Sequence, residues 1–224
     1  FIEVFNELAE KVGIKTRYSK IKSASKTYIE TLEKINRHAI FNLKENDKVL
    51  DYLLNIRKIS EEYIDLFKLG FIESGVLDLI NKNNLDKTIC KEMSLIAEGE
   101  YGFYDVIKNR ITIPLFSKNQ HIVGLSNRKF LEEDTYAKYV NPANSLIFKK
   151  NSYLYGLNWS EQAIKDEDKV IIVEGYFDFM KLYSNGIKNV VAINGTTIMS
   201  TQVKDLMKLT NNFYLCLDSD KAGE

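Results

Sequence analysis

Three carboxylates follow two apolar runs near the end of the chain and are candidates for metal binding. Glu174 follows Val170-Ile-Ile-Val173, and Asp218 and Asp220 follow the apolar residues 213–217. Carboxylates that share one point repel one another, and one of them becomes protonated unless a cation lies between them. Mg²⁺ binds one or two carboxylates, keeps waters and takes phosphate oxygens in its remaining positions. This pattern indicates a divalent-metal site suited to phosphoryl transfer.

The residues between these acids predict how the two apolar runs are arranged. Apolar residues at helical spacing predict helices near residues 177–186 and 200–209, the second with Ser200 or Thr201 as its N-cap. Asn189-Val-Val-Ala-Ile193 predicts a buried strand between them. Strands joined through short helices run parallel with right-handed connections.

The parallel arrangement predicts that the three acids meet. The carboxyl ends of parallel strands open onto the ligand crevice, so Glu174, Asp218 and Asp220 are expected to face one site. From spacing alone, an equally good interpretation is that acids follow buried strands because the chain returns to water there.

Three ordered motifs in this region resemble those of the Toprim domain, which bacterial primases and topoisomerases share. They are Glu174-Gly-Tyr-Phe-Asp178, Asn194-Gly-Thr196 and Asp218-Ser-Asp-Lys-Ala-Gly223, and they are most similar to those of the bacterial DnaG-type DNA primases. The resemblance implies that Glu174, Asp218 and Asp220 are catalytic residues that hold Mg²⁺ or Mn²⁺. Asp178 is expected to act beside them, orienting a ligand or capping amides.

One residue of these motifs departs from the family pattern. Asn194 stands where family members often have Leu. Because Asn tolerates the left-handed backbone that such turns need, we expect the fold to be kept.

The middle of the chain resembles the amino-terminal subdomain of the primase core. The resemblance lies in Arg110-Ile-Thr-Ile-Pro114, Gly124-Leu-Ser-Asn-Arg128, Lys138-Tyr-Val-Asn141 and residues 148–156. In the family, basic residues of this region line the cleft for the single-stranded template and the incoming nucleotides. The resemblance implies that role for Lys108, Arg110, Arg128, Lys138, Asn141 and Lys150. A guanidinium binds phosphate bidentately, whereas Lys supplies a point charge.

Charge is unevenly distributed along the chain, although 31 Lys and Arg residues balance 31 Asp and Glu residues. Residues 108–150 contain eight Lys or Arg residues and three acids, whereas the residues from 166 onward contain nine acids and six bases. A basic half that faces an acidic half suits a polyanion held beside a cation.

The two cysteines and the hydropathy restrict the class of protein. Cys90 and Cys216 are too few and too far apart for a Cys-rich zinc site, and Cys216, inside an apolar strand, is expected to be a buried free thiol. A reducing cytoplasm is the compartment that this cysteine usage favours. No run reaches membrane-spanning length, and the first residues lack the pattern of a signal peptide, so no membrane partner is expected.

The elements upstream of the metal motifs are predicted to be mainly helical and then β. Residues 1–12 predict an amphipathic helix, similar to the tail of the zinc-binding domain that precedes the primase core, and the basic, Ser-rich residues 17–26 predict a linker. Apolar residues at helical spacing predict helices from 26 to 84, and one apolar stripe contains Tyr28, Leu32, Ile35 and Ile40. Ser60 is expected to be an N-cap, and short helices are expected from 76 to 89. Residues 110–116 and 121–125 predict a β-hairpin, in which Pro114 requires an edge or a bulge.

We therefore predict an α/β chain in which a mixed α+β amino-terminal subdomain packs on a partial Toprim βαβαβ parallel sheet. Residues 1–25 would be the preceding tail and linker, 26–165 the basic subdomain and 166–224 the partial Toprim subdomain. The resemblance implies a DNA primase, a nucleotidyltransferase that makes short RNA primers on single-stranded DNA from ribonucleoside triphosphates in the bacterial cytoplasm, at the nucleoid.

The chain is also expected to be a fragment that is inactive alone. The family has a further acidic motif downstream of Asp-x-Asp, and this chain ends at Glu224. Zinc is expected only in a preceding domain, and contact with the replicative helicase only in a carboxy-terminal domain, neither of which this chain contains.

Two alternatives remain open at this point. One is another Toprim enzyme, a topoisomerase or a nuclease, although none of the 13 tyrosines has a recognisable setting for topoisomerase chemistry. The other is a non-catalytic fragment that binds single-stranded DNA.

Overall fold

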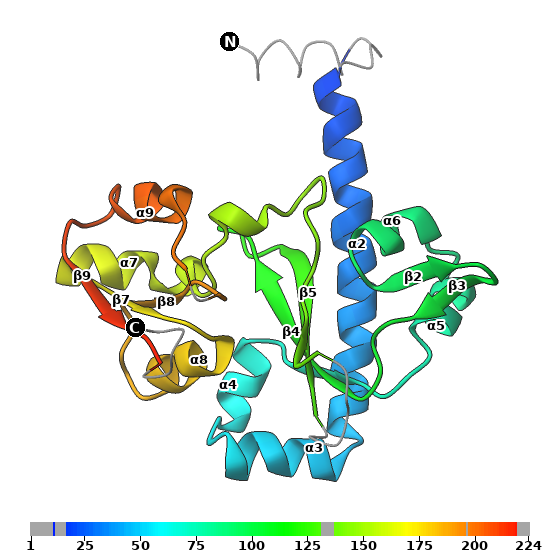
Figure 1. The fold of residues 1–224 in the computed structure, drawn as a ribbon, viewed down its shortest axis with the longest axis horizontal. Helices are drawn as coiled ribbons and strands as arrows, with labels where there is room; N and C mark the ends of the chain where they lie inside the picture. The colour runs from blue at the N-terminus through cyan, green and yellow to red at the C-terminus, as the bar shows by residue number, and fades with distance from the viewer. Residues whose placement is uncertain (1–10, 12–16, 131–136, 196, 219–224) are drawn as a thin grey trace.

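The described residues form two larger β-sheets, each with its own helices, and a two-stranded hairpin. The computed structural model describes residue 11 and residues 17–130, 137–195 and 197–218. An antiparallel sheet lies at the centre with the long helix α2 beside it, and a three-stranded parallel sheet lies to one side (Figure 1). This arrangement confirms the predicted mixed α/β class. Asp220 and the predicted helix at 1–12, apart from residue 11, lie outside the described residues.

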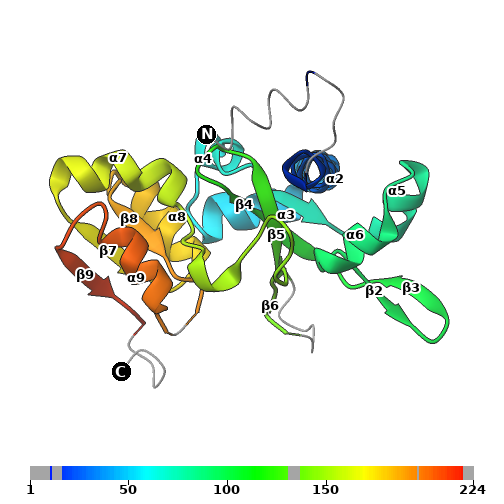
Figure 2. The same cartoon turned by 90° about the horizontal axis from the view of Figure 1, so that it is seen from above.

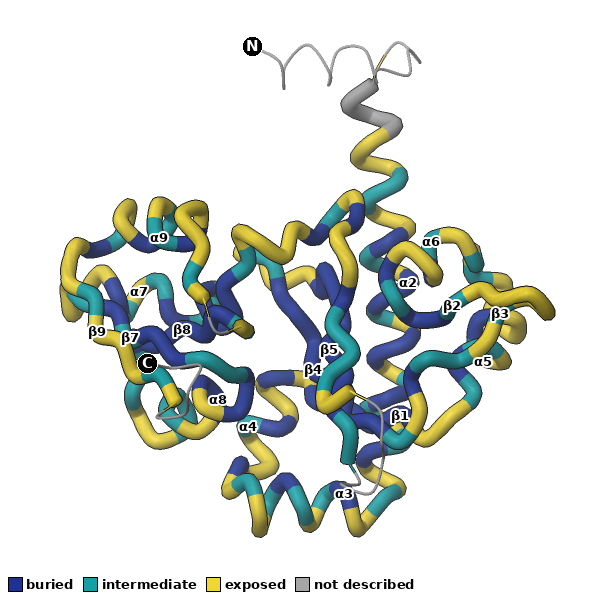
Figure 3. Tube along the Cα trace, viewed as in Figure 1, coloured by how far each residue is buried: buried dark blue, intermediate teal, exposed yellow. Residues whose placement is uncertain are grey.

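The amino-terminal helix α2 (Arg17–Lys44) corrects the predicted linker. Residues 17–26 belong to this helix, because they contain neither Gly nor Pro and extend a helix that packing further along the chain already stabilises. Its buried stripe contains Tyr28, Leu32 and Ile35 as predicted, with Ala39 in place of Ile40. Residues 21–27, near the start of α2, are exposed or half-buried and project from the body of the protein (Figure 3).

Short helices follow α2 and frame the antiparallel sheet. They are α3 (Asp47–Asp51), the π-helical turn η1 (Tyr52–Ile56), α4 (Glu61–Leu66), α5 (Val76–Lys82) and α6 (Lys87–Glu92). Ser60 is the N-cap residue of α4, as predicted, although its hydroxyl makes no capping hydrogen bond. Within the described residues, none of the helices combines the length and the apolar character needed to cross a membrane.

The antiparallel sheet has the strand order β1-β4-β5-β6. Its strands are β1 (Gly70–Ile72), β4 (Arg110–Phe116), β5 (Ile122–Lys129) and β6 (Tyr139–Val140). The predicted hairpin is confirmed, and Pro114 lies past the three residues of β4 that pair with β1, next to an irregularity at Leu115/Phe116. The placement of Pro114 agrees with the expected edge or bulge. A second hairpin, β2 (Ile96–Gly99) with β3 (Gly102–Asp105), was not predicted because its Gly and acidic residues lack strand propensity.

Helix α2 packs closely against this sheet at one glycine. A β-carbon added to Gly70 on β1 would lie 2.5 Å from the Cβ of Ala39 and 2.7 Å from the carbonyl carbon of Ala39 on α2. Only glycine allows the two backbones to come this near. The close contact fixes the sheet that carries the basic residues.

The parallel sheet has the order β8-β7-β9, with both strand pairs parallel as predicted. The strands are β7 (Val170–Val173), β8 (Val190–Ala192) and β9 (Phe213–Cys216), and the helices are α7 (Leu157–Glu167), α8 (Tyr176–Ser184) and α9 (Ser200–Leu206). A 3₁₀ turn at Lys150–Ser152 precedes α7.

The N-cap of α9 differs from the prediction. Met199 occupies the cap position, and its backbone N–H donates to Gln202 Oε1 at 2.8 Å. The expectation of Ser200 or Thr201 at this position was therefore wrong. The Gln202 side chain, at the third helical position, accepts the backbone N–H of the cap residue, so this amide is satisfied although the cap residue has no hydroxyl.

Side chains alternate between the two faces of the parallel sheet. Val170 and Ile172 of β7 pack in a cluster with α7 and α9, whereas Val173 packs in the large cluster that contains α8. The helices consequently lie on both sides of the sheet (Figures 1 and 2). The large cluster also contains Phe67 and Phe71 from the amino-terminal half, so one core joins both halves.

Strand β9 is exposed, which contradicts the expectation of a buried Cys216. Cys216 is exposed, as are Tyr214 (57%) and Leu215 (64%). The reason is topological, because β9 pairs only with β7 among the described strands and forms the edge of the sheet. Cys90, in contrast, is fully buried on α6.

The two cysteines should therefore differ in reactivity. Burial, and secondarily the charge of Asp86, raises the pKa of the Cys90 thiol to about 12. Because the thiolate is the reactive form, a water-soluble thiol reagent at mildly alkaline pH should label Cys216 in the folded protein and Cys90 only after unfolding. Mass spectrometry of the labelled peptides measures this, and rapid labelling of Cys90 in the folded protein would contradict the structure.

Candidate active site

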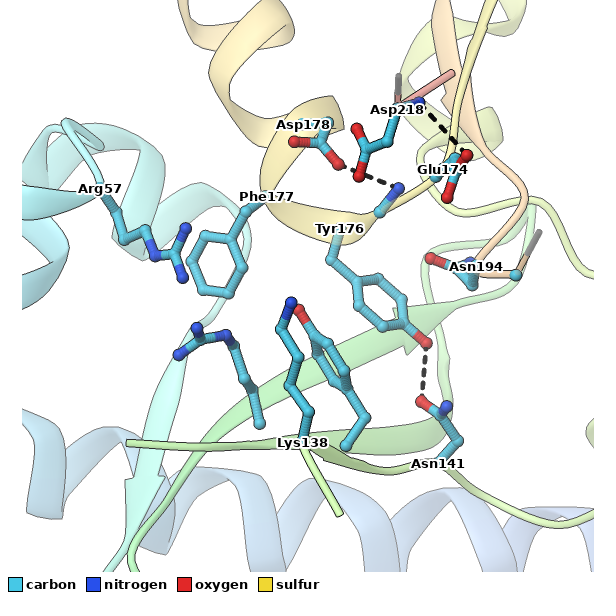
Figure 4. A pocket seen from close by; sticks show the side chains of 13 residues that line it. Arg57, Lys138, Asn141, Glu174, Tyr176, Phe177, Asp178, Asn194 and Asp218 are labelled. Atoms are coloured by element: carbon cyan, nitrogen blue, oxygen red, sulfur yellow. Dashed lines mark hydrogen bonds between the residues drawn. The ribbon is translucent and has the colours of Figure 1, made fainter. Parts of the chain in front are cut away.

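A pocket of about 480 Å³ lies where the parallel sheet faces the antiparallel sheet. Acidic side chains lie at one end and basic side chains at the other (Figure 4). The lining residues are Arg57, Arg128, Lys138, Tyr139, Asn141, Glu174, Gly175, Tyr176, Phe177, Asp178, Asn194, Gly195 and Asp218. The pocket therefore brings together the predicted acids Glu174, Asp178 and Asp218 with three of the predicted template-cleft residues.

The acidic end is built by neighbouring strands of the parallel sheet. Val173 and Cys216 are partners in the register of β7 and β9, so the residues after them leave the sheet at the same edge. Glu174 Oε1 accepts a hydrogen bond from the backbone N–H of Asp218 at 3.2 Å. The structure thus places Glu174 and Asp218 side by side, whereas Asp220 lies outside the described residues.

Asp178 stabilises the loop that carries Glu174. Its Oδ2 accepts a hydrogen bond from the backbone N–H of Gly175 at 3.1 Å, which caps the start of α8. A carboxylate at this position also interacts favourably with the helix dipole. Asp178 therefore fixes the turn between β7 and α8.

The oxygen donors at the acidic end fit a hard divalent cation. In the described residues no group of three His, Cys, Asp or Glu side chains converges on one point. Glu174 and Asp218 nevertheless offer two carboxylates at adjacent strand ends, and Mg²⁺ commonly uses one or two carboxylates together with water and phosphate. This donor set suits Mg²⁺ or Mn²⁺ rather than a soft metal, which would require Cys or His.

The basic end is organised by two aromatic rings. The Arg57 guanidinium lies 4.7 Å from the centre of the Phe177 ring and 5.2 Å from that of Tyr52, and its Nε donates to the Tyr52 hydroxyl at 2.6 Å. Arg128 lies 5.7 Å from the centres of both rings. The rings hold two like charges close together through cation–π attraction.

These cations are available for an anionic ligand. Arg128 is only 7% exposed; its guanidinium donates to the Lys129 carbonyl at 3.0 Å, and its Nε has no hydrogen-bond partner among the described residues. In the stretches of chain that the structure describes, no ion pair involves Arg57, Arg128 or Lys138. A site with unpaired cations opposite carboxylates can bind a phosphate-bearing ligand beside a metal ion.

Aromatic hydroxyls complete the wall between the two ends. Burial raises the pKa of Tyr139, although the positive charges of Arg128 and Arg57 oppose the shift. Burial also raises the pKa of Tyr176, whose hydroxyl donates to Asn141 Oδ1 at 3.2 Å. The Ser126 hydroxyl donates to the same oxygen at 2.7 Å, which holds Asn141 in place.

The other predicted cleft residues lie outside this pocket. Lys150 lines a small adjoining pocket that shares Asn141 and Asn194 with the first one. Lys108 and Arg110 line a separate pocket, and the Arg110 guanidinium donates to the carbonyl oxygens of Asn127 at 3.3 Å and Ala137 at 3.0 Å. Arg110 is 3% exposed and ties β4 to β5 and to the segment before β6.

Arg57 is the main site residue that the sequence did not reveal. It follows a helical stretch with ordinary apolar periodicity, and nothing beside it in the sequence marks a site. The π-helical turn brings Arg57 and Tyr52, five residues apart, into contact, as the bond from the Arg57 backbone N–H to the Tyr52 carbonyl at 2.9 Å demonstrates. Such turns are frequent at functional sites, but no sequence pattern predicts them.

Comparison with known proteins identifies the class of the fold and site. The family model "DNA primase catalytic core, N-terminal domain" matches residues 37–161, and the Toprim domain model matches residues 168–224. The fold and site are thus those of a Toprim-containing primase catalytic core, of which the chain covers a part. The chain belongs to the DNA primase family.

Individual relatives agree with this assignment. The chain is 31% identical to the DNA primase of Aquifex aeolicus and 32% identical to that of Clostridium acetobutylicum, covering 100% of this chain in both cases but 45% and 38% of the relatives. The chain therefore spans less than half the length of these two relatives.

Solved structures agree as well. The zinc-binding and RNA polymerase domains of the Aquifex aeolicus primase match with a TM-score of 0.80 and 31% identity over 99% of this chain and 55% of that one. A DnaG primase catalytic domain bound to single-stranded DNA matches with a TM-score of 0.77 and 28% identity over 89% of this chain and 63% of that one.

Proposed function

We propose that this chain supplies the template cleft and the first part of the metal site of a DNA primase. The full-length enzyme would synthesise short RNA primers on single-stranded DNA from ribonucleoside triphosphates. The observation that carries this proposal is the single pocket in which Glu174 and Asp218 face Arg57, Arg128 and Lys138. A polyanion and a divalent cation can be held there at the same time.

Each end of the pocket has its own task in nucleotidyl transfer. Glu174 and Asp218 would hold Mg²⁺ or Mn²⁺, with Asp220 beside them, and the bound metal would supply charge that neutralises the triphosphate and lowers the pKa of the attacking 3′-hydroxyl. Asp178 keeps the loop of Glu174 in position through the Gly175 amide.

The basic end binds phosphate. Arg57, Arg128 and Lys138 would bind phosphate groups of the template or of the nucleotide, and Asn141 and the adjoining Lys150 extend that surface. The relative that was solved with single-stranded DNA bound supports single-stranded DNA as the ligand. Lys108 and Arg110, in their separate pocket, would contact nucleic acid only further along its path.

Partners and location follow from the family. The zinc site is proposed to lie in a preceding domain, as the Aquifex aeolicus structure with its zinc-binding domain suggests, and the helicase contact in a carboxy-terminal domain. The enzyme would act at the nucleoid in the bacterial cytoplasm. We propose a subdomain boundary near residue 165, between the two matched family models.

Product analysis tests the proposed function. The full-length protein, given labelled ribonucleotides, Mn²⁺ and a single-stranded template, should form short RNA. Cleavage of the template without RNA synthesis would favour a nuclease or topoisomerase of the same fold. Template binding without any product would leave only a DNA-binding role.

Lys138→Gln should weaken template binding in a way that depends on salt. Lys138 is exposed at the rim of the pocket, so the fold should tolerate its neutralisation. Loss of one phosphate contact lowers the slope of log K against log salt concentration by about 0.7 for a single strand. Fluorescence anisotropy with labelled single-stranded DNA measures this slope.

Lys204→Gln is the matched control for this experiment. Lys204 is an exposed lysine on α9 that does not line the pocket. An equal change of slope in both variants would argue against a specific contact at Lys138.

A further inference from the structure

Asn194 carries a side-chain oxygen for which none of the described residues provides a donor. Its side-chain nitrogen donates to the Ala192 carbonyl at 3.4 Å. The opposite atom, Oδ1, is buried and has no hydrogen-bond partner among the residues that the structure describes. Because a buried acceptor without a donor costs free energy, a ligand that donates to it recovers this cost on binding.

The oxygen belongs to the metal end of the pocket. Asn194 lines the same pocket as Glu174 and Asp218, and in Figure 4 its side chain lies between Glu174 and Asn141. The backbone N–H of Asn194 donates to the Glu174 carbonyl at 2.8 Å, and that of Ile193 donates to the Val173 carbonyl at 3.1 Å. These bonds hold the acceptor at a fixed place relative to the metal-binding carboxylates.

The chemistry of the acceptor selects its ligand. Phosphate groups offer only acceptor oxygens at neutral pH and cannot pair with Oδ1, whereas a sugar hydroxyl is a neutral donor. In a nucleotide the sugar is joined directly to the phosphates, so phosphates bound between the metal end and the cations would place the sugar hydroxyls in the pocket that Asn194 lines.

We propose that Asn194 Oδ1 accepts a hydrogen bond from the 2′-hydroxyl of the bound nucleotide and thereby favours ribonucleotides over deoxyribonucleotides. The proposal rests on the proposed function, because it needs a nucleotide in this pocket. Sites that bind a substrate hydroxyl discriminate against the analogue without it, because the polar group of the protein then stays unpaired.

A purely conformational role is the competing explanation, and two variants separate it from recognition. Asn194 has a left-handed φ of 56°, a conformation that Asn tolerates better than most residues. Asn194→Gly keeps this conformation accessible and removes the oxygen, whereas Asn194→Asp keeps both the tolerance and an acceptor. The negative charge of Asp acts on both kinds of nucleotide alike, so the ratio of their affinities is the informative quantity.

The experiment measures the affinities of ATP, 2′-deoxy-ATP and 3′-deoxy-ATP for the full-length protein with Mn²⁺, together with RNA synthesis. The natural protein should bind ATP about tenfold more tightly than 2′-deoxy-ATP, which is the order expected for one hydrogen bond. In Asn194→Gly the ratio should fall towards one, and in Asn194→Asp it should persist.

The outcomes separate the two proposals. An unchanged ratio in Asn194→Gly, or a loss confined to discrimination against 3′-deoxy-ATP, would overturn the role of Asn194 while leaving the primase assignment intact. A natural protein that neither binds ATP nor makes RNA would overturn the proposed function, and the role of Asn194 with it.

Discussion

Glu174→Gln in the full-length protein should reduce RNA primer synthesis by about 10³-fold, the order expected when an essential charge contact to the reacting groups is lost. Glutamine has nearly the same shape and can still accept the Asp218 amide hydrogen through its side-chain oxygen, so the loop should keep its geometry. The change removes the negative charge that is proposed to hold the metal. Primer synthesis at saturating nucleotide concentration measures the effect.

The same variant should leave template affinity nearly unchanged. Template binding is proposed to depend on the basic end of the pocket, and Glu174 lies at the acidic end. Glu167→Gln provides the matched control, because Glu167 is an exposed acid at the end of α7, paired with Lys169 and outside the pocket. Full primer synthesis by Glu174→Gln would exclude Glu174 as a metal ligand.

Gly156→Ala should lower the free energy of unfolding by about 3 kcal/mol. About 1 kcal/mol of this is the cost of alanine in the left-handed conformation, and the rest is the cost of overpacking. Gly156 has a φ of 87°, and an added Cβ would lie 2.0 Å from Cε2 of Phe179. The Phe179 ring is fully buried and contacts Phe67 and Tyr155 with ring centres 5.9 Å and 5.1 Å away, so it has no room to move.

Gly186→Ala is the control for the conformational part of this effect, so the difference between the two variants gives the steric part. Gly186 has a similar φ of 94°, and nothing lies within 4 Å of its added Cβ. We expect this control to lose only about 1 kcal/mol. Urea unfolding of both variants measures the difference, and equal midpoints would contradict the packing of Phe179 beneath Gly156.

The fold was predictable where local patterns and topology agree. The branched residues of β4 and β5 and the apolar runs of β7 and β8 have strand patterns that packing reinforces. Parallel connectivity then brought Glu174 and Asp218 to one edge, because strand order and handedness leave few alternatives.

Other features depend on contacts that the sequence does not display. Residues 17–26 continue α2 because the packed residues further along the chain already stabilise the helix, so no new nucleation is needed. Cys216 is exposed because β9 is an edge strand, whereas its apolar neighbours suggested burial. Arg57 reaches the pocket through a π-helical turn, and Arg110 binds backbone carbonyls although its family motif suggested a template contact.

The most direct test of the metal site is calorimetric titration of the full-length protein with Mn²⁺. We predict a binding event in the natural protein that is lost in the double variant Glu174→Gln/Asp218→Asn and kept in Glu167→Gln. Equal Mn²⁺ affinity in the natural protein and the double variant would contradict the assignment of Glu174 and Asp218 as metal ligands.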